Sequence, residues 1–261
     1  MGTPHLGLRQ YLLALLTGFG CSFAAPTFAA TVFWTNPGGG SWNTATNWSG
    51  GTVPTAADDV HITMDGTYTV VLDVNATIAS LTLGGTTGEQ TLVNFAPTLT
   101  LTTASTVQTG GVLAMSGGTL DAAGTLTVNG LLRCSGGAAY GTITVATSGA
   151  CELTGSADRY LVGSLANSGR VTWSGANNLF LAGDARFENL PTGTIEIQND
   201  QTVVLASGSP QIVNAGLIRK TAGAGATALG VPLDSSGTLE VQTGAIIYAA
   251  GSVFRDGSSF T

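Results

Sequence analysis

Side chains with acid–base chemistry are few in this sequence. Only 9% of the 261 residues are charged, and the net charge is −7. On a β-helix, a polysaccharide lyase would use clustered acids for Ca²⁺ and a basic residue, and a glycosidase would use two facing carboxylates. The candidates at outward strand positions are Glu152, Asp158, Arg159, Asp184, Arg186 and Glu188.

Glu152 and Glu196 come nearest to a glycosidase pair. They occupy equivalent positions in repeats that lie two apart, so the strand spacing separates them by about 10 Å. This distance is wide for an acid and a base that act on one bond. We therefore expect these charges to form a solvated face, and we assign no catalytic residue.

His61 is the single histidine after residue 30. It alternates with Val60 and Ile62, which predicts a strand residue that faces solvent. A Ser-His-Asp triad lacks support because no Gly-x-Ser-x-Gly elbow occurs. Asp58 and Asp59 offer carboxylates for calcium, but the spacing of a defined calcium loop is missing. We assign no metal ligand and no cofactor.

Cys134 and Cys151 are the two cysteines after residue 30. An exported protein permits a disulfide. However, the repeat register makes the two residues diagonal neighbours with Cα atoms about 8 Å apart, beyond the usual bridging limit of about 7 Å. We therefore predict two buried thiols.

An internal repeat must position these side chains. A glycine opens a short alternating segment at Gly111 and at six later places, in steps of 19, 19, 20, 24, 23 and 21 residues, with a mean of 21. The chain holds 38 glycines and 43% hydrophobic residues, which is typical of strands and tight turns around a core. The later repeat glycines are Gly130, Gly149, Gly169, Gly193, Gly216 and Gly237.

Alternation within the repeat separates an inside from an outside. The residues two and four places after each glycine are nearly all apolar, whereas the residues one and three places after it carry the charges. We expect the first set to face inward, and the glycines to occupy corners that need a positive φ. The inward set is Leu113 and Met115, Leu132 and Cys134, Cys151 and Leu153, Val171 and Trp173, Ile195 and Ile197.

A repeat of about 21 residues with two or three strands suits one coil of a right-handed parallel β-helix, whose coils stack about 4.8 Å apart. We expect this all-β fold over residues 58–261. A β-sandwich is the alternative, but it needs no register of side-chain type from repeat to repeat. Segments 174–192 and 198–215 are interpreted as longer turns, with a binding face as the alternative.

Residues 31–57 are interpreted as an N-terminal cap. The open end of a β-helix exposes unpaired strand edges that invite aggregation. Three tryptophans in this segment, Trp34, Trp42 and Trp48, would cover the first coil. A sugar-stacking aromatic surface is the functional alternative.

Several motifs resemble those of large bacterial extracellular repeat proteins with autotransporter-passenger or adhesin-like β-helices. They are GSWNTATNWSGGTVP at Gly40–Pro54, the segment Asp58–Ile62, ASLTLGG at Ala79–Gly85, and GTLDAAGTLTVNG at Gly118–Gly130. The resemblance covers most of residues 32–250 and implies location and architecture rather than an activity. The sequence departs from it at Cys134, where such repeats often carry Trp before Ser-Gly-Gly.

The N-terminus predicts export. Arg9 precedes the apolar run 11–16, and small residues follow up to Ala30, which is typical of a signal peptide over residues 1–30. The run is too short to span a bilayer, and we expect no membrane span after signal removal. Nucleic acid is not expected as a partner because the sequence has no basic patch.

Taken together, these patterns predict a secreted or cell-surface structural or adhesive module without catalytic activity. Its expected partners are surface glycans or other cell-surface proteins, and the alternative is a carbohydrate-active enzyme. A minor alternative, an ice-binding solenoid, needs threonine rows across many coils. We expect none, because the position after the repeat glycine varies from Val112 to Arg170 and Thr194. Since the sequence stops at Thr261 within another turn, we expect a fragment of a longer protein.

Overall fold

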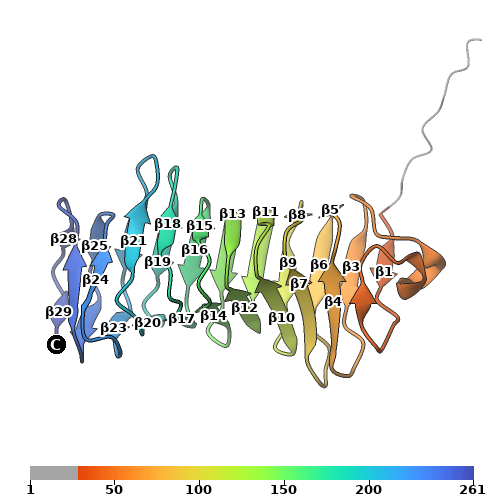
Figure 1. Ribbon diagram of the computed structural model, residues 1–261, viewed down its shortest axis with the longest axis horizontal. Coiled ribbons are helices and arrows are strands. Elements are labelled where there is room, and N and C mark those ends of the chain that lie inside the picture. The colour runs from red at the N-terminus through yellow and green to blue at the C-terminus, as the bar shows by residue number, and fades with distance from the viewer. Residues whose placement is uncertain (1–28) are drawn as a thin grey trace, which may run out of the picture.

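The computed structural model describes residues 29–261, so nearly all of the predicted signal peptide lies outside the described residues. The described chain forms about ten coils of roughly 21 residues, with parallel strands and 3% helix. It is a β-solenoid, as the repeat predicted, and Figure 1 shows the coils stacked along one long axis. The β-sandwich alternative is wrong, because each strand pairs in parallel with its counterpart in the next coil.

One side of the coils is an 11-stranded parallel sheet, called here the first sheet. Its strands are β2 (Gly40–Ser41), β4 (Tyr68–Leu72), β7 (Gln90–Asn94), β10 (Gly111–Met115), β12 (Leu131–Cys134), β14 (Ala150–Leu153), β17 (Arg170–Trp173), β20 (Thr194–Ile197), β23 (Leu217–Lys220), β26 (Thr238–Val241) and β29 (Ser259–Phe260).

The other two sides join into one 18-stranded sheet, because β11 (Thr119–Val128) and β13 (Gly137–Val145) run around the corner between them. The second side holds the first parts of β11 and β13 with β5 (Ala76–Ile78), β8 (Thr98–Leu101), β15 (Arg159–Leu161), β18 (Leu179–Leu181), β21 (Thr202–Leu205), β24 (Ala226–Leu229) and β27 (Ala245–Tyr248). The third side holds their later parts with β1 (Thr31–Phe33), β3 (Asp59–Ile62), β6 (Ser80–Leu83), β9 (Ser105–Val107), β16 (Ser164–Asn167), β19 (Arg186–Asn189), β22 (Gln211–Asn214), β25 (Leu233–Ser235) and β28 (Val253–Phe254).

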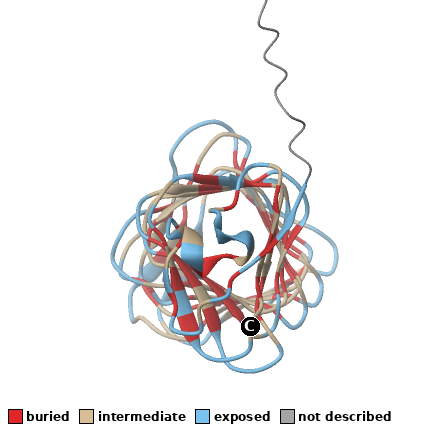
Figure 2. Ribbon diagram, turned by 90° about the vertical axis from the view of Figure 1, so that its right-hand side faces the viewer, coloured by how far each residue is buried: buried red, intermediate tan, exposed pale blue. Residues whose placement is uncertain are grey.

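The predicted register is confirmed. Leu132 pairs with Leu113 in the preceding coil and with Cys151 in the following coil, and Val171 and Ile195 continue the row. All ten predicted inward residues except the half-buried Cys134 are buried. In Figure 2 the coils form a ring whose strands carry the buried residues. The core is thus a column of aliphatic side chains along the axis.

The repeat glycines serve a purpose other than the one predicted. None of the seven has a positive φ. Instead, a Cβ at Gly130 would lie 2.1 Å from the carbonyl oxygen of Gln108, and one at Gly149 would lie 2.0 Å from that of Val128. The expectation of positive φ is therefore wrong for these positions. Glycine is required there because the corner of each coil rests directly on the backbone of the coil before it.

The segment 31–57 lies at the N-terminal end of the solenoid. Its strands β1 and β2 pair with β3 and β4, and two short 3-10 helices follow, η1 (Ala45–Asn47) and η2 (Ser49–Gly51). Short helical turns lie across the middle of the ring in Figure 2. Trp34, Trp42 and Trp48 are buried and pack edge-to-face, with centroids 4.9 and 4.7 Å apart. Because the three rings are buried, they do not form a sugar-stacking surface, and a capping role for the segment stays a prediction.

An asparagine ladder runs through the later coils, which the sequence analysis missed. Asn167, Asn189, Asn214 and Ser235 occupy one inward row of the third side and are buried. The Nδ2 of Asn167 donates to Asn189 Oδ1 at 2.9 Å, and the Nδ2 of Asn189 donates to Asn214 Oδ1 at 2.9 Å. Each of the three amides also donates to a backbone carbonyl. The row therefore buries polar groups without leaving their donors unpaired.

Lys220 interrupts the aliphatic column at an inward position of β23. It is fully buried, and its Nζ lies 2.8 Å from Asp200 Oδ1 and 3.1 Å from Thr227 Oγ1. It also donates to the carbonyl oxygens of Asn199 and Ala222 at 2.5 and 3.0 Å. The buried charge is thus fully surrounded by acceptors.

Candidate functional site

Glu152 and Glu196 lie on the outer face of the first sheet, as predicted. Thr172 separates them in register, which places the two carboxylates two strand spacings apart, about 10 Å. Glu152 accepts from Arg133 Nε at 2.9 Å. The two carboxylates therefore sit in separate ion pairs and do not face one another.

Glu196 is the most enclosed carboxylate of this face, with 7% of the residue exposed. Its Oε1 accepts from Gln198 at 2.7 Å and from Thr221 at 3.1 Å, and its Oε2 lies 2.5 Å from Arg170 and 3.6 Å from Arg219. The hydrogen bond from Gln198 is the largest of the effects that lower the pKa of Glu196. A general acid would need the opposite shift, so the surroundings of Glu196 favour a fixed negative charge.

The other acidic candidates belong to other parts of the coils. Asp158 is exposed and accepts from Asn177 Nδ2 at 2.7 Å. Asp184 is exposed in the turn after β18. Arg186 and Glu188, on β19 of the third side, pair with each other at 2.6 Å. The structure does not bring these groups together with Glu152.

Arg159 was expected to face outward, and this expectation is wrong. In β15 the alternation puts Arg159 and Leu161 inside and leaves Tyr160 exposed. Only 2% of Arg159 is exposed, and burial lowers the pKa of its guanidinium. Its Nη1 donates to the carbonyl of Thr154, and its Nη2 donates to that of Asn177 at 2.5 Å. A side chain so enclosed cannot serve as a surface base.

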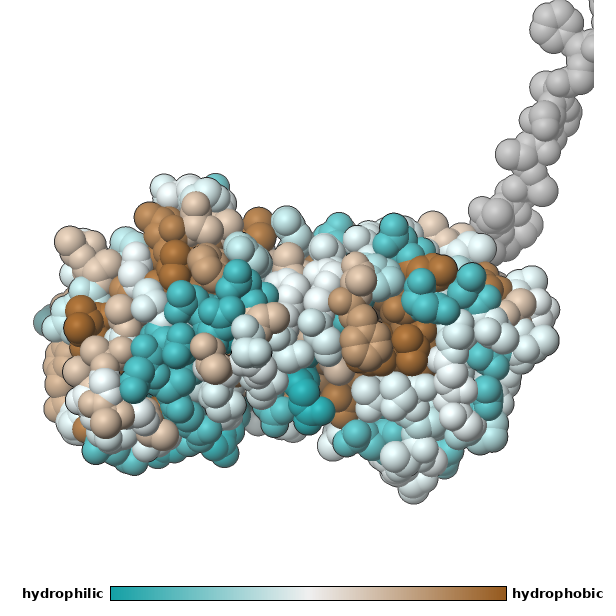
Figure 3. Space-filling view, viewed as in Figure 1, coloured by the Kyte–Doolittle hydropathy of each residue, from teal (hydrophilic) through white to brown (hydrophobic). Residues whose placement is uncertain are grey.

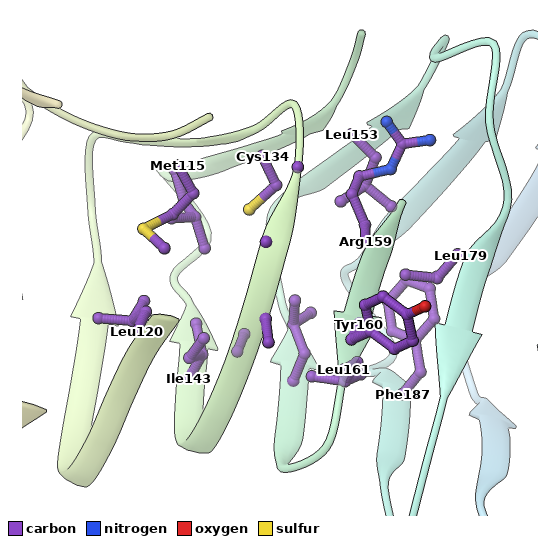
Figure 4. A pocket seen from close by; sticks show the side chains of 16 residues that line it. Met115, Leu120, Cys134, Ile143, Leu153, Arg159, Tyr160, Leu161, Leu179 and Phe187 are labelled. Carbon is purple, nitrogen blue, oxygen red and sulfur yellow. The ribbon is translucent and has the colours of Figure 1, made fainter. Parts of the chain in front are cut away.

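A small cavity of about 40 Å³ lies beside Arg159 in the interior. It exists because Ala139 takes the inward position that Leu120 and Leu161 fill in the neighbouring coils. Figure 4 shows Met115 and Cys134 on one side of it and Ile143 and Leu161 on the other. The volume would admit a water molecule, but a lining that is nearly all apolar offers water few partners. We interpret it as a packing defect.

The cysteines lie as the register predicted. Cys134 pairs with Leu153, and Cys151 pairs with Leu132, so the two are diagonal neighbours. Both are free thiols. Cys151 is fully buried, as predicted, but the prediction of a buried thiol is wrong for Cys134, which is half-buried beside the cavity. A hydrogen bond with Cys134, followed by burial, raises the pKa of the Cys151 thiol well above its usual value, which disfavours a reactive thiolate.

The residues around His61 are occupied by structural contacts. His61 lies on the outer face of β3, as predicted, with its ring 5.0 Å from that of Phe33. Asp58 accepts from Thr55 N at 2.7 Å and from Ala30 N at 3.2 Å, and Asp59 accepts from Ser80 Oγ at 2.5 Å. Within residues 29–261, no group of three or more His, Cys, Asp or Glu side chains is placed to hold a metal ion.

The outer face of the first sheet changes character along the solenoid. Over the early coils it carries an apolar strip, defined here as Val71, Val93, Val112, Ala114 and Leu131, which pack together. The three central residues of the strip are buried by this packing, and Val71 and Leu131 are half-buried. Over the later coils the same rows carry a charged strip. Figure 3 shows a hydrophobic area over β4, β7 and β10 and a hydrophilic one over β17, β20 and β23. The charged strip is Arg133, Glu152, Arg170, Glu196, Arg219 and Glu240.

A shallow hollow of about 340 Å³ borders the apolar strip. It follows the corner between the third side and the first sheet, where the repeat glycines leave little side-chain volume. Apolar and polar side chains both line it. They are Val112, Leu131 and Ala150, together with Glu89, Thr109, Asn129, Ser148 and Glu152.

Threonine rows on the third side contradict the expectation that no regular row exists. Thr82, Thr106, Thr127 and Thr144 are in register on the outer face of four consecutive coils. The sequence analysis inspected only the position after the repeat glycine, which lies on a different side. The signal that finds the row is the recurrence of Thr-Leu-Thr-Val at 125–128 as Thr-Ile-Thr-Val at 142–145.

No family model matches the chain, and the searches of curated proteins and of solved structures found no significant match. No helix within residues 29–261 is long and apolar enough to cross a membrane. The candidate surfaces are therefore defined by geometry alone: the apolar strip with its bordering hollow, the charged strip, and the threonine rows.

Proposed function

We propose that the chain is a structural or adhesive module of the cell surface or the extracellular space. The solenoid acts as a rigid spacer, and the outer face of its first sheet makes the contacts. The observation that carries this proposal is the unbroken parallel ladder from β2 to β29. In such a stack each coil contacts its neighbours, so the array behaves as a quasi-one-dimensional rod.

The apolar strip supplies the contact surface. Val71 and Leu131 are only half-buried and leave apolar surface open to solvent, and exposed apolar surface of this kind is typical of interaction sites. The strip spans four adjacent coils, and the hollow beside it adds hydroxyl, amide and carboxylate groups. Surface glycans and other cell-surface proteins present mixed apolar and polar groups of this kind. Many weak contacts along one flank would add up to firm attachment.

The surroundings of the carboxylates support a role without catalysis. Glu152 and Glu196 are held in ion pairs with arginines, and the lowered pKa of Glu196 opposes proton donation. The extracellular location rests on the export signal expected over residues 1–30, and the resemblance to autotransporter-passenger and adhesin-like repeats agrees with it.

A matched pair of variants tests the contact surface. Leu131 and Leu217 occupy the same outward row and are both half-buried. Leu131→Asp places a charge in the apolar strip, whereas Leu217→Asp places one in the charged strip. We expect only the first to weaken binding to a glycan array and to intact bacterial surfaces. Equal binding by both variants, or no binding by the unaltered chain, would count against an adhesive role.

The enzymatic alternative has its own test. The chain is incubated with a broad panel of polysaccharides, and released reducing ends and unsaturated products are measured. We expect no cleavage. Cleavage that disappears in Glu152→Gln would overturn the proposal and identify a carbohydrate-active enzyme.

A further inference from the structure

The threonine rows form a two-dimensional array on the third side. Besides the row of four, Thr125 and Thr142 lie two residues earlier on the two coils that carry Thr127 and Thr144, and they pair with each other. Side chains in one row are about 4.8 Å apart, and the two rows are about 6.7 Å apart along the strands. The threonine array is Thr82, Thr106, Thr125, Thr127, Thr142 and Thr144.

The hydroxyls of the threonine array are available to solvent. Thr125 and Thr142 are exposed, and the other four are partly exposed. Within the described chain none of the six hydroxyls has a protein hydrogen-bond partner, whereas Thr102 and Thr103 nearby donate to the carbonyls of Ile78 and Ala79. The array therefore presents donors and acceptors that only an external ligand or water can satisfy.

The array is electrically neutral, and its borders are not. In the row of Thr144, Ala166 follows and then Glu188. In the row of Thr142, Ser164 follows and then Arg186. At the other end His61 pairs with Thr82. Charges are thus confined to the edges, and no exposed aromatic ring lies within the array.

The positions of the array are held firmly. β-branched threonine has a restricted χ1, and each strand of the array pairs with a parallel neighbour on both sides. Beneath the array lie Leu81, Leu83, Leu126, Val128 and Ile143, none more than 1% exposed. The regular spacing of the hydroxyls is therefore a property of the packed coil.

We propose that the threonine array binds ice. Its hydroxyls, repeated about 4.8 Å apart along a row and without protein partners in the described chain, would order water into a lattice-like layer that merges with the ice surface. A charged or aromatic surface would be the expected match for an ionic partner or a sugar ring, and the array offers neither. The site is separate from the apolar strip, which lies on another side of the coils.

The test measures thermal hysteresis and inhibition of ice recrystallisation with the full chain. We expect the unaltered chain to show both. Thr127→Lys puts a long, charged side chain in the middle of the array and should abolish both activities. Thr172→Lys is the matched control, because Thr172 is an outward, half-buried threonine of the first sheet, and it should keep both. Far-UV circular dichroism confirms that each variant keeps the β fold.

Three outcomes would overturn the proposal. One is the absence of ice activity in the unaltered chain, and another is equal loss in Thr127→Lys and Thr172→Lys. The third is binding to crystalline cellulose or chitin that Thr127→Lys abolishes, without ice activity, which would identify a glycan surface instead. Leu131→Asp should leave ice activity intact, so failure of the adhesive proposal and failure of this one are distinguishable.

Discussion

The early and the later coils build the same backbone stack with different side chains. In the inward row of the third side, the early coils place Leu83, Val107, Val128 and Val145, and the later coils place Asn167, Asn189, Asn214 and Ser235. On the outer face of the first sheet, the apolar strip gives way to the charged strip over the same stretch of coils. An inward or outward row of the solenoid can thus hold either apolar or polar side chains, provided that neighbouring coils carry the same kind.

There is a physical reason why neighbouring coils carry the same kind of side chain in an inward row. A buried amide needs partners about one coil spacing away, and only another polar side chain in the same row or a backbone carbonyl supplies them. A buried valine needs only contact. Substitutions on either side of the boundary between Val145 and Asn167 can therefore test whether the early and the later coils differ in their tolerance of buried amides.

The largest expected effect comes from placing an amide among the valines. Val128→Asn would lose apolar burial and leave an amide between Val107 and Val145 without side-chain partners. We expect a loss of about 3–4 kcal/mol in the free energy of unfolding, measured by urea denaturation. A loss below about 1 kcal/mol would mean that the inward row of the early coils tolerates polar groups, which contradicts the proposed difference between the early and the later coils.

The converse change in the later coils should cost less. Asn189→Val leaves the amides of Asn167 and Asn214 without one partner each, but it adds apolar burial. We expect a loss of about 2 kcal/mol in the same urea measurement. The triple change of Asn167, Asn189 and Asn214 to Val should cost less than three such losses, because it removes the partners together. Strict additivity would contradict a cooperative ladder.

Extending the ladder by one coil sharpens the boundary. Val145→Asn places an amide next to Asn167, whose Oδ1 already accepts from the backbone of Gly169 and has a second lone pair. We expect Val145→Asn to be about 1–2 kcal/mol less destabilising than Val128→Asn. Equal losses of unfolding free energy in urea denaturation would show that the polarity of the neighbouring side chain does not decide how much a buried amide destabilises the fold.

The smallest effect concerns the charged strip and depends on pH. The folded pKa of Glu196 is lowered from 4.5, chiefly by Gln198, so the folded state favours the ionised form. Its contribution to stability is present above the unfolded pKa and is lost as pH falls through the folded pKa. Stability curves of the unaltered chain and Glu196→Gln should therefore converge on acidification from about pH 6 to about pH 3. Parallel curves would show that the ion pairs of Glu196 contribute nothing.

Much of the architecture follows from the sequence. The recurrence of Gly111-type segments predicted the coil, the register and the buried face from Leu113 to Ile197, because a solenoid repeats its environment at every turn. Three features did not follow. Arg159 faces inward because the alternation of β15 buries Arg159 and Leu161 and exposes Tyr160. Lys220 is buried because Asp200, in the turn after β20, and Thr227, on β24, provide acceptors for its ammonium group. The asparagine ladder depends on which asparagines share one row.

The sequence by itself determined the kind of fold, the coil length and the inward positions of the first sheet, since each is a local pattern of side-chain alternation repeated every 19–24 residues. Only the tertiary structure decided which residues become neighbours across coils. Unequal coil lengths shift each row by a different number of residues, so the threonine array, the apolar strip and the asparagine ladder emerge only once the coils are stacked. It also decided why the repeat glycines are needed, because the close approach of a carbonyl in the preceding coil exists only in the folded stack.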